Sequence, residues 1–390
     1  MSGSINHLPV ELILVVLSHL PLESLISFGE TSRANYQYHL ASLKCLRLAV
    51  FQRRIHSVVS FLQAGWATPD ELMPDDGLEV AYAATVIQHR TGSGLDTYGD
   101  YYPGDRSSKR RKWASEMGCP KSLKQTIRAQ NDIFSKLLNR YGQSLDHLEF
   151  MAYDLDTDGA IALGTNCRHS LHRLALRFEH PHVRDGIMRP STWLRPGPGS
   201  TAWNALIGIG PYKSMGLRSL ETLVLERSGI TPWQLSILVK NNPRLTTLKL
   251  RTCSGAQPEF LDWLGGCEVG QEYLEVAPGA RLKVLWLENC QQLLSSPIPV
   301  FGKEDESLDS GLEWIRGLRS LRVCHGPHVE PSREYGHLCR QSLSLRECRS
   351  IPAEYVDRAN ASIWKIPEVI LPYSLQPVEA PIIEVDPLLK

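Results

Sequence analysis

The sequence contains no long apolar segment. Its longest unbroken run of apolar residues extends from Leu12 to Leu17, whereas a helix that crosses a bilayer needs about 20 apolar residues. We also expect no secretory signal, because no basic segment precedes this run. The sequence therefore predicts an intracellular protein, cytoplasmic, nuclear or both, with no membrane partner.

An excess of charge of either sign is also missing. Lys and Arg together number 42, as do Asp and Glu, so the formal net charge is zero. Without a net positive field, we expect no nucleic-acid partner. One basic run, Lys109 to Lys112, matches either a nuclear localisation signal or, more often for such runs, a solvated loop.

Paired metal-binding motifs are absent. The nine cysteines are an odd number, widely spread, and none forms a C-x-x-C pair, so free thiols in a reducing compartment are expected. His180-Pro-His182 and Cys324-His325-x-x-His328 suggest zinc, but neither has a matching second half. We predict no metal and no cofactor.

Residues Asp154 to Gly159 match the start of a calcium-binding EF-hand loop, with carboxylates at alternate positions before a turning glycine. The twelfth position is Thr165 instead of the bidentate glutamate. An acidic loop after a strand is therefore the preferred interpretation, and a calcium sensor or metal-dependent enzyme is the weaker one. No G-x-S-x-G motif is present, and we predict no catalytic residue.

The chain begins with a dense pair of apolar helices. Leu8-Pro9-x-Glu11-Leu12 opens the first, because proline fits the first turn and a carboxylate there interacts well with the helix dipole. Leu20-Pro21 ends it, and a second helix begins near Glu23. Leucines at 40, 43, 46 and 48 continue the apolar pattern. One small helix pair cannot bury all these side chains, so a protein-docking surface is expected.

Together with Ser24-Leu25 and Ser32-Arg33, this pattern resembles an F-box across residues 4–50. The resemblance implies binding to the Skp adaptor of Skp–cullin–F-box ubiquitin ligases, and through it to a cullin. Other side chains of the set must hold the helices together, and the sequence does not separate the two groups. The candidate adaptor-binding residues are Leu8, Pro9, Glu11, Leu12, Val16, Leu17, Leu20, Pro21 and Leu25.

A repeated L-x-x-L-x-L pattern follows the helical part. It begins at Leu145, Leu171, Leu220, Leu245, Leu282 and Leu318, and a degenerate copy, Leu343-x-Leu345, closes the series. The shorter spacings fit a leucine-rich repeat of about 20–29 residues, in which each unit buries its apolar face against its neighbours. The longer spacing between 177 and 219 implies either an insertion or a hidden repeat. Segments 232–239 and 260–264 are expected return helices.

Strand ends carry small side chains at one place. Cys253, Cys290 and Cys348 stand three residues after the last apolar strand residue, and Ser228 holds the same place in its unit. A small side chain there can turn inward and meet loop backbone groups. This position accounts for three cysteines without catalysis or metal binding.

Strand alternation predicts two exposed columns on the concave face. The first contains Glu149, Ala175, Val224, Lys249, Trp286, Arg322 and Ser344, and the second contains Met151, Arg177, Glu226, Arg251, Glu288, Cys324 and Arg346. Charges alternate along the second, which favours mutual compensation between strands. Trp286 is either a recognition anchor or covered by the C-terminal tail. The candidate substrate-binding residues are Lys249, Arg251, Trp286, Glu288 and Arg322.

The sequence thus predicts an α/β protein. It comprises a small helical F-box domain (1–55), a helical connector (56–142) with a polar loop at 91–112, a leucine-rich-repeat solenoid of parallel strands and return helices (143–350), and an extended proline-rich tail (351–390). Apolar residues 81–87 of the connector are expected to be helical. The resemblance implies a non-catalytic subunit that recruits a protein substrate for ubiquitylation by proximity. A scaffold that binds the adaptor without ubiquitylation is the alternative.

Overall fold

The structure is a computed structural model that describes residues 8–20, 22–51, 82–88, 123–178, 201–267, 276–290, 293–294, 308–321 and 341–372. The chain divides into two compact units. The first is Met1–Gly255 with Ser332–Leu338, and the second is Ala256–Pro331 with Cys339–Lys390. Each unit is α/β and is described by itself below.

The first unit begins with three short helices, α1 (Val10–Ser18), α2 (Leu22–Glu30) and α3 (Arg33–Ser42). Pro9 occupies the cap position of α1, and Ile13 N–H donates to its carbonyl at 3.1 Å. The Ser32 hydroxyl caps α3 by accepting from Asn35 N–H at 3.1 Å. Pro9 and Ser32 therefore mark where α1 and α3 begin.

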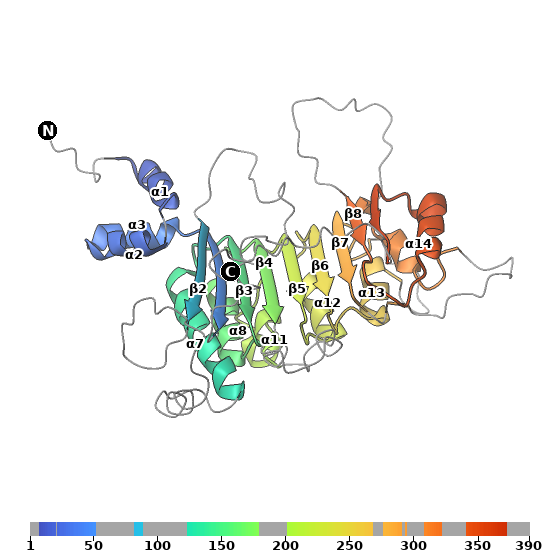
Figure 1. The fold of residues 1–390 in the computed structure, drawn as a ribbon, viewed down its shortest axis with the longest axis horizontal. Coiled ribbons are helices and arrows are strands. Elements are labelled where there is room, and N and C mark those ends of the chain that lie inside the picture. Colours follow the sequence, from blue (N-terminus) through green and yellow to red (C-terminus); the bar gives the residue numbers. More distant parts are fainter. Residues whose placement is uncertain are drawn as a thin grey trace, which may run out of the picture. The chain divides into compact units, whose positions relative to one another are not determined.

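Six parallel strands of the first unit follow the order β2-β1-β3-β4-β5-β6 (Figure 1). Their helices are α7 (Leu123–Tyr141), α8 (Thr157–Asn166), α11 (Trp203–Ile207) and α12 (Pro232–Lys240), with a 3-10 turn, η2, at Gly210–Tyr212. The strands are β1 (Cys45–Phe51), β2 (Tyr82–Gln88), β3 (His147–Ala152), β4 (Arg173–Phe178), β5 (Thr222–Glu226) and β6 (Thr247–Arg251).

Leucines of the repeat pattern form the core between these strands and helices. Leu148, Leu174, Leu223 and Leu248 share one register across the sheet, and each is at most 1% exposed. Phe150 stacks on Phe134 of α7 with ring centroids 3.8 Å apart. The helices contact one another in the order α7, α8, α11, α12, as the strands do. This architecture is the one expected of a repeat solenoid, in which each unit is stabilised by its neighbours.

Strand starts show the same repetition in the backbone. One carbonyl before each strand accepts two consecutive N–H groups at the start of the next strand, at 2.7–3.1 Å. Repeated use of this contact fixes the register between neighbouring strands. The acceptors are Lys44, Asp146, His172 and Glu221.

The second unit contains α13 (Pro258–Gly265) and strands β7 (Val284–Glu288), β8 (Ser342–Ser344) and β9 (Glu368–Ile370), which pair in parallel in that order. Its remaining elements are the 3-10 turns η3 (Glu313–Gly317) and η4 (Arg319–Leu321), helix α14 (Ala353–Ala359) and a π-helical turn, η5 (Asn360–Trp364). Asp309 is fully buried and accepts from Arg316 Nε at 2.7 Å and from Trp364 Nε1 at 3.1 Å. The return helices predicted at 232–239 and 260–264 are confirmed as α12 and α13.

The N-terminal domain expected to be helical over residues 1–55 has its last helix, α3, end at Ser42. Residues 45–51 form β1 instead, because Leu46 and Leu48 alternate with Arg47 at the period of a strand and pair in register with Leu148 and Phe150. The segment expected to be helical at 81–87 is likewise a strand, β2. The sheet therefore begins earlier in the chain than the repeat pattern indicated.

Two expectations about the repeats need correction or completion. The pattern at Leu318 adds no strand between β7 and β8, which pair directly, and Leu318 and Leu321 instead lie buried in and beside 3-10 turns. β4 pairs directly with β5, so no hidden repeat adds a strand between them. The long spacing there is an insertion with respect to the sheet.

The segment after residue 350 is not uniformly extended. Pro352 precedes α14, where its ring is tolerated because the first turn of a helix needs no amide donor. Tyr355, Val356 and Trp364 are buried, and β9 then extends the sheet of the second unit. The prediction of an extended tail is thus wrong for 353–364, and residues 373–390 lie outside the described part.

Candidate functional site

Helix α1 separates its apolar side chains onto two faces. Ile13 and Leu17, four residues apart, are each 1% exposed and pack with Leu25 of α2. Leu20, Phe28 and Tyr38 pack around this cluster and are partly buried. These residues form the small core that holds the three helices together.

Beyond this core, α1 and the residue that precedes its cap expose an apolar surface to solvent, mostly on the face opposite Ile13 and Leu17. Leu12 is 51% exposed, and the other members are 40–45% exposed. Large apolar side chains that cluster on one helix face typically mark a site of protein contact. We call this set, Leu8, Val10, Leu12, Val15 and Val16, the α1 docking surface.

The predicted adaptor-binding residues therefore differ in their exposure. Leu8, Pro9, Glu11, Leu12 and Val16 are exposed. Leu17 and Leu25 are buried in the helical core, so the prediction that they contact a partner directly needs correction. Leu20 is half-buried against that core, and the Pro21 side chain lies outside the described residues.

Two members of the α1 docking surface were not among the predicted site residues. Val10 and Val15 are 45% and 40% exposed beside Leu8 and Leu12. Spacings of four and then three residues place Leu8, Leu12 and Val15 on one face. Val10 lies on another side of the helix and is exposed at its first residue. That spacing was the signal that would have separated surface from core.

The second predicted site, the concave columns of the sheet, is mostly buried. Lys249 is 2% exposed, Glu288 7%, and Arg251 and Trp286 are partly exposed. Trp286 Nε1 donates to Ser342 Oγ at 3.1 Å, which ties this ring to β8. The expectation of two exposed columns is wrong, and Arg322 lies outside the described residues.

Charges in these columns pair between neighbouring strands, which confirms the predicted compensation. Glu226 lies 3.7 Å from Arg177 of β4 and 3.7 Å from Arg251 of β6. Arg47 of β1 lies 3.4 Å from Glu149 of β3. Buried charges are stable only when they are paired in this way. We call this set, Arg47, Glu149, Arg177, Glu226 and the partly exposed Arg251, the buried ion-pair ladder.

Histidine 147 extends the ladder at the start of β3. Its Nε2 lies 3.1 Å from Glu149 Oε1, and Cys45 is its register partner on β1. Burial lowers the pKa of His147, but hydrogen bonds to Cys45 and Glu149 outweigh it and raise this pKa to about 9. Burial raises the pKa of Glu149, and His147 and the Arg47 charge reverse that effect, so the pKa lies below its ordinary value. The group is therefore an ion pair at neutral pH.

The small residues after the strands turn inward as predicted. Ser228, Cys253, Cys290 and Cys348 are all buried, and the residue before each has a positive φ, at Arg227, Thr252, Asn289 and Glu347. The Ser228 hydroxyl lies 3.0 Å from Cys253 Sγ, and the Cys348 thiol donates to Leu287 O at 2.6 Å. These cysteines have structural roles, and the described cysteines are free thiols.

The acidic loop is an ordinary connection after β3. Asp156 caps α8 by accepting from Gly159 N–H at 2.9 Å, and Asp154 accepts from Leu155 N–H at 2.8 Å. Burial raises the pKa of Asp154 and of Asp156, which disfavours charged carboxylates there. Across the residues that the structure describes, no cluster of three potential metal ligands occurs. The His180, His182, Cys324, His325 and His328 motifs, like the basic run at 109–112, lie outside those residues.

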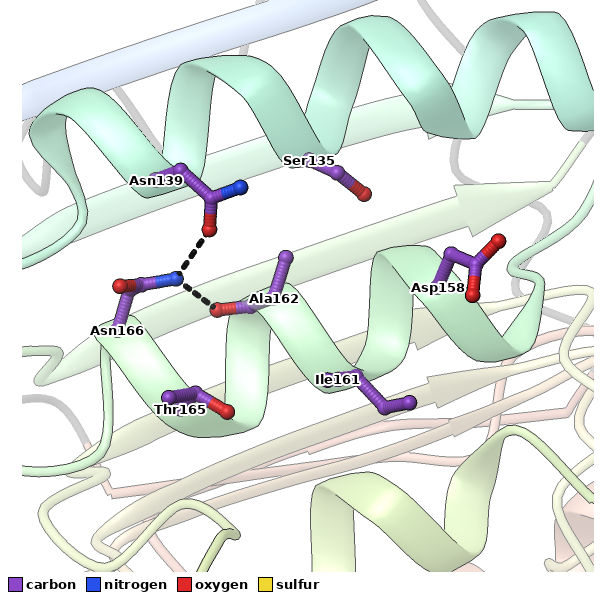
Figure 2. Close-up of a pocket in the computed structure, with 7 residues that line it drawn as sticks. All are labelled: Ser135, Asn139, Asp158, Ile161, Ala162, Thr165 and Asn166. Atoms are coloured by element: carbon purple, nitrogen blue, oxygen red, sulfur yellow. Dashed lines mark hydrogen bonds between the residues drawn. The ribbon is translucent and has the colours of Figure 1, made fainter.

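An open depression of about 320 Å³ lies between α7 and α8. Figure 2 shows its seven lining residues, with the Asn166 amide between the two helices. That amide donates to Asn139 Oδ1 at 2.8 Å and to Ala162 O at 2.9 Å, so it serves helix packing. Ser135, Asp158 and Thr165 border the rest, and the lining offers no histidine or lysine to activate the hydroxyl groups.

No model of a known protein family matches the chain, and no curated protein matches it. Within the described residues, none of the helices is both long and apolar enough to cross a bilayer. The α1 docking surface is thus the feature of the described residues best suited to a function. The side chains that it exposes are apolar.

Proposed function

We propose that this chain is a non-catalytic substrate-recognition subunit of a Skp–cullin–F-box ubiquitin ligase. The single observation that supports the proposal most is the α1 docking surface. Five large apolar side chains stand 40% or more exposed within nine residues, Leu8 to Val16. Covering each by a partner contributes roughly 1 kcal/mol, at about 25 cal/mol per Å² of apolar area.

Three short helices at the place of the F-box-like motif support the proposal. The motif residues Leu8-Pro9-x-Glu11-Leu12 lie at the start of α1, which ends at Ser18, α2 begins at Leu22, and Ser32-Arg33 starts α3. In this proposal Leu8, Pro9 and Leu12 contact a Skp-type adaptor, whereas Leu17 and Leu25 pack in the helical core that supports this surface. The adaptor in turn binds a cullin.

The repeat strands would hold the protein substrate. Arg251 and Trp286 are the predicted substrate-binding residues that keep partly exposed side chains. Lys249 and Glu288 would act indirectly, through the packing of the sheet face. Catalysis would belong to the conjugating enzyme, since this chain supplies proximity alone.

Co-expression with a Skp-type adaptor and a cullin tests the proposal. We expect both to copurify with the full chain, and the double variant Leu8→Ala, Pro9→Ala to lose both while its sheet stays folded. Capture of the adaptor without the cullin would favour the scaffold alternative. Capture of neither would contradict the F-box assignment.

A further inference from the structure

The three N-terminal helices meet the sheet-bearing part of the first unit at a small contact. α3 continues into β1 through only Leu43 and Lys44, and Ser144 Oγ donates to Leu43 O at 3.0 Å. Beside this connector, His39 of α3 contacts Tyr141 of α7. A two-residue connector limits how far α3 and β1 can separate, but it does not limit rotation of the helices about it. The contact between His39 and Tyr141 must therefore fix the orientation of the three helices with respect to the sheet.

The contact at His39 is tightly built. The ring is fully buried, its Nε2 lies 2.9 Å from the Tyr141 hydroxyl, and the two rings meet edge-on with centroids 5.3 Å apart. Gly29 of α2 makes room for it, because a Cβ at position 29 would come within 2.7 Å of His39 Nδ1. Arg140 lies over the rings of Tyr36 and Tyr141, 5.3 Å from each centroid.

This arrangement suits a neutral imidazole and disfavours a protonated one. Nδ1 is buried without a hydrogen-bond partner, so an added proton there would find no acceptor. Burial lowers the pKa of His39, the positive charge of Arg140 on α7 lowers it further, and Glu30 on α2 opposes them. The phenol groups of Tyr36 and Tyr141 complete the titratable surroundings, and burial raises the pKa of Tyr141.

We propose that His39 closes a joint that fixes the three N-terminal helices on α7, and that protonation of His39 opens this joint. The joint sets where the α1 docking surface is held with respect to the strands of the first unit. It does not depend on the identity of the partner that docks there. The histidine is a positioning residue, and the fold gives it a pH-sensitive role.

The sign of the pH effect follows from the linkage between protonation and stability. With the folded-state pKa below the ordinary 6.5, the open form binds more protons than the closed form as pH falls through 6.5. The joint is therefore fully closed above that pH and loses stability below it. Substitution by glutamine, which carries an amide near the Nε2 position but does not titrate in this range, removes this dependence.

Single-molecule energy transfer between dyes on α2 and α8 tests the joint in the full chain. Dyes attached to non-natural residues at the exposed positions Ser24 and Thr165 leave the native thiols untouched. We expect one dominant population and a minor second one at pH 7.5, and a larger second population at pH 5.5. Tyr141→Phe leaves His39 Nε2 unpaired and should raise the second population about tenfold at pH 7.5, the effect expected of one lost buried hydrogen bond.

Matched variants separate this proposal from unfolding. Arg140→Gln changes an exposed side chain and should weaken the joint without altering helix content, measured by circular dichroism. His169→Ala removes an exposed histidine away from the joint and should match the wild type at both pH values. A single unchanged population in Tyr141→Phe would overturn the joint, and a pH response retained in His39→Gln would overturn the role of His39 protonation.

Discussion

Two leucines of α1 provide a matched test of how its two faces differ. Leu17 is 1% exposed within the helical core, and Leu12 is 51% exposed on the α1 docking surface. Leu17→Ala removes buried methyl groups and leaves a cavity among Ile13, Leu25 and their neighbours, at a cost of about 2–5 kcal/mol. Leu12→Ala removes a side chain already in water, and such changes alter the free energy of unfolding by about 0.5 kcal/mol or less.

Hydrogen exchange by mass spectrometry measures this difference directly on peptides from α1, α2 and α3. A cost of 2 kcal/mol or more corresponds to exchange roughly thirty-fold faster in Leu17→Ala. Peptides from β3 to β6 should be unchanged and serve as an internal control. Equal effects of the two substitutions, or a larger effect of Leu12→Ala, would refute the assignment of the two faces.

Three further outcomes follow from polar side chains of the first unit. Glu226→Gln leaves Arg177 and Arg251 without their shared carboxylate and should destabilise the first unit by about 3–5 kcal/mol, measured by urea unfolding; a loss below about 1 kcal/mol would contradict the buried ion-pair ladder. The pKa of His147 is about 9 in the fold and 6.5 for a free group. The stabilisation that its charge provides is therefore complete below pH 6.5 and is lost as the pH rises towards 9. His147→Gln should abolish this part of the pH dependence of the free energy of unfolding, measured by urea unfolding. Asp156→Ala should cost about 1 kcal/mol through the lost helix cap, and added calcium should leave the melting temperature unchanged, whereas a rise would restore the calcium hypothesis.

The sequence predicted the repeat strands well where the full L-x-x-L-x-L pattern coincides with a strand. Leu148, Leu174, Leu223 and Leu248 align in the sheet because the L-x-x-L-x-L spacing directly encodes one buried face. The pattern misled at Leu318, where the same spacing gives 3-10 turns. Leucine spacing specifies burial, and the choice between strand and turn depends on pairing with β7 and β8.

Site residues were harder to predict, because burial of both sheet faces depends on tertiary structure. Period-two alternation indicated that Glu149 and Lys249 face away from the helices, but not that this face is closed. The His39–Tyr141 contact joins residues 102 positions apart in the chain, so no local sequence pattern could predict it. On α1, by contrast, the helical period contained the information needed to separate Leu12 from Leu17.

Binding of a purified Skp-type adaptor to the full chain, measured by isothermal titration calorimetry, tests the central claim most directly. The account predicts one adaptor per chain, loss of binding in Leu12→Asp, and normal binding in Gln37→Ala, a change of an exposed polar residue on α3. Absence of binding by the wild type, or equal binding by Leu12→Asp, would contradict it.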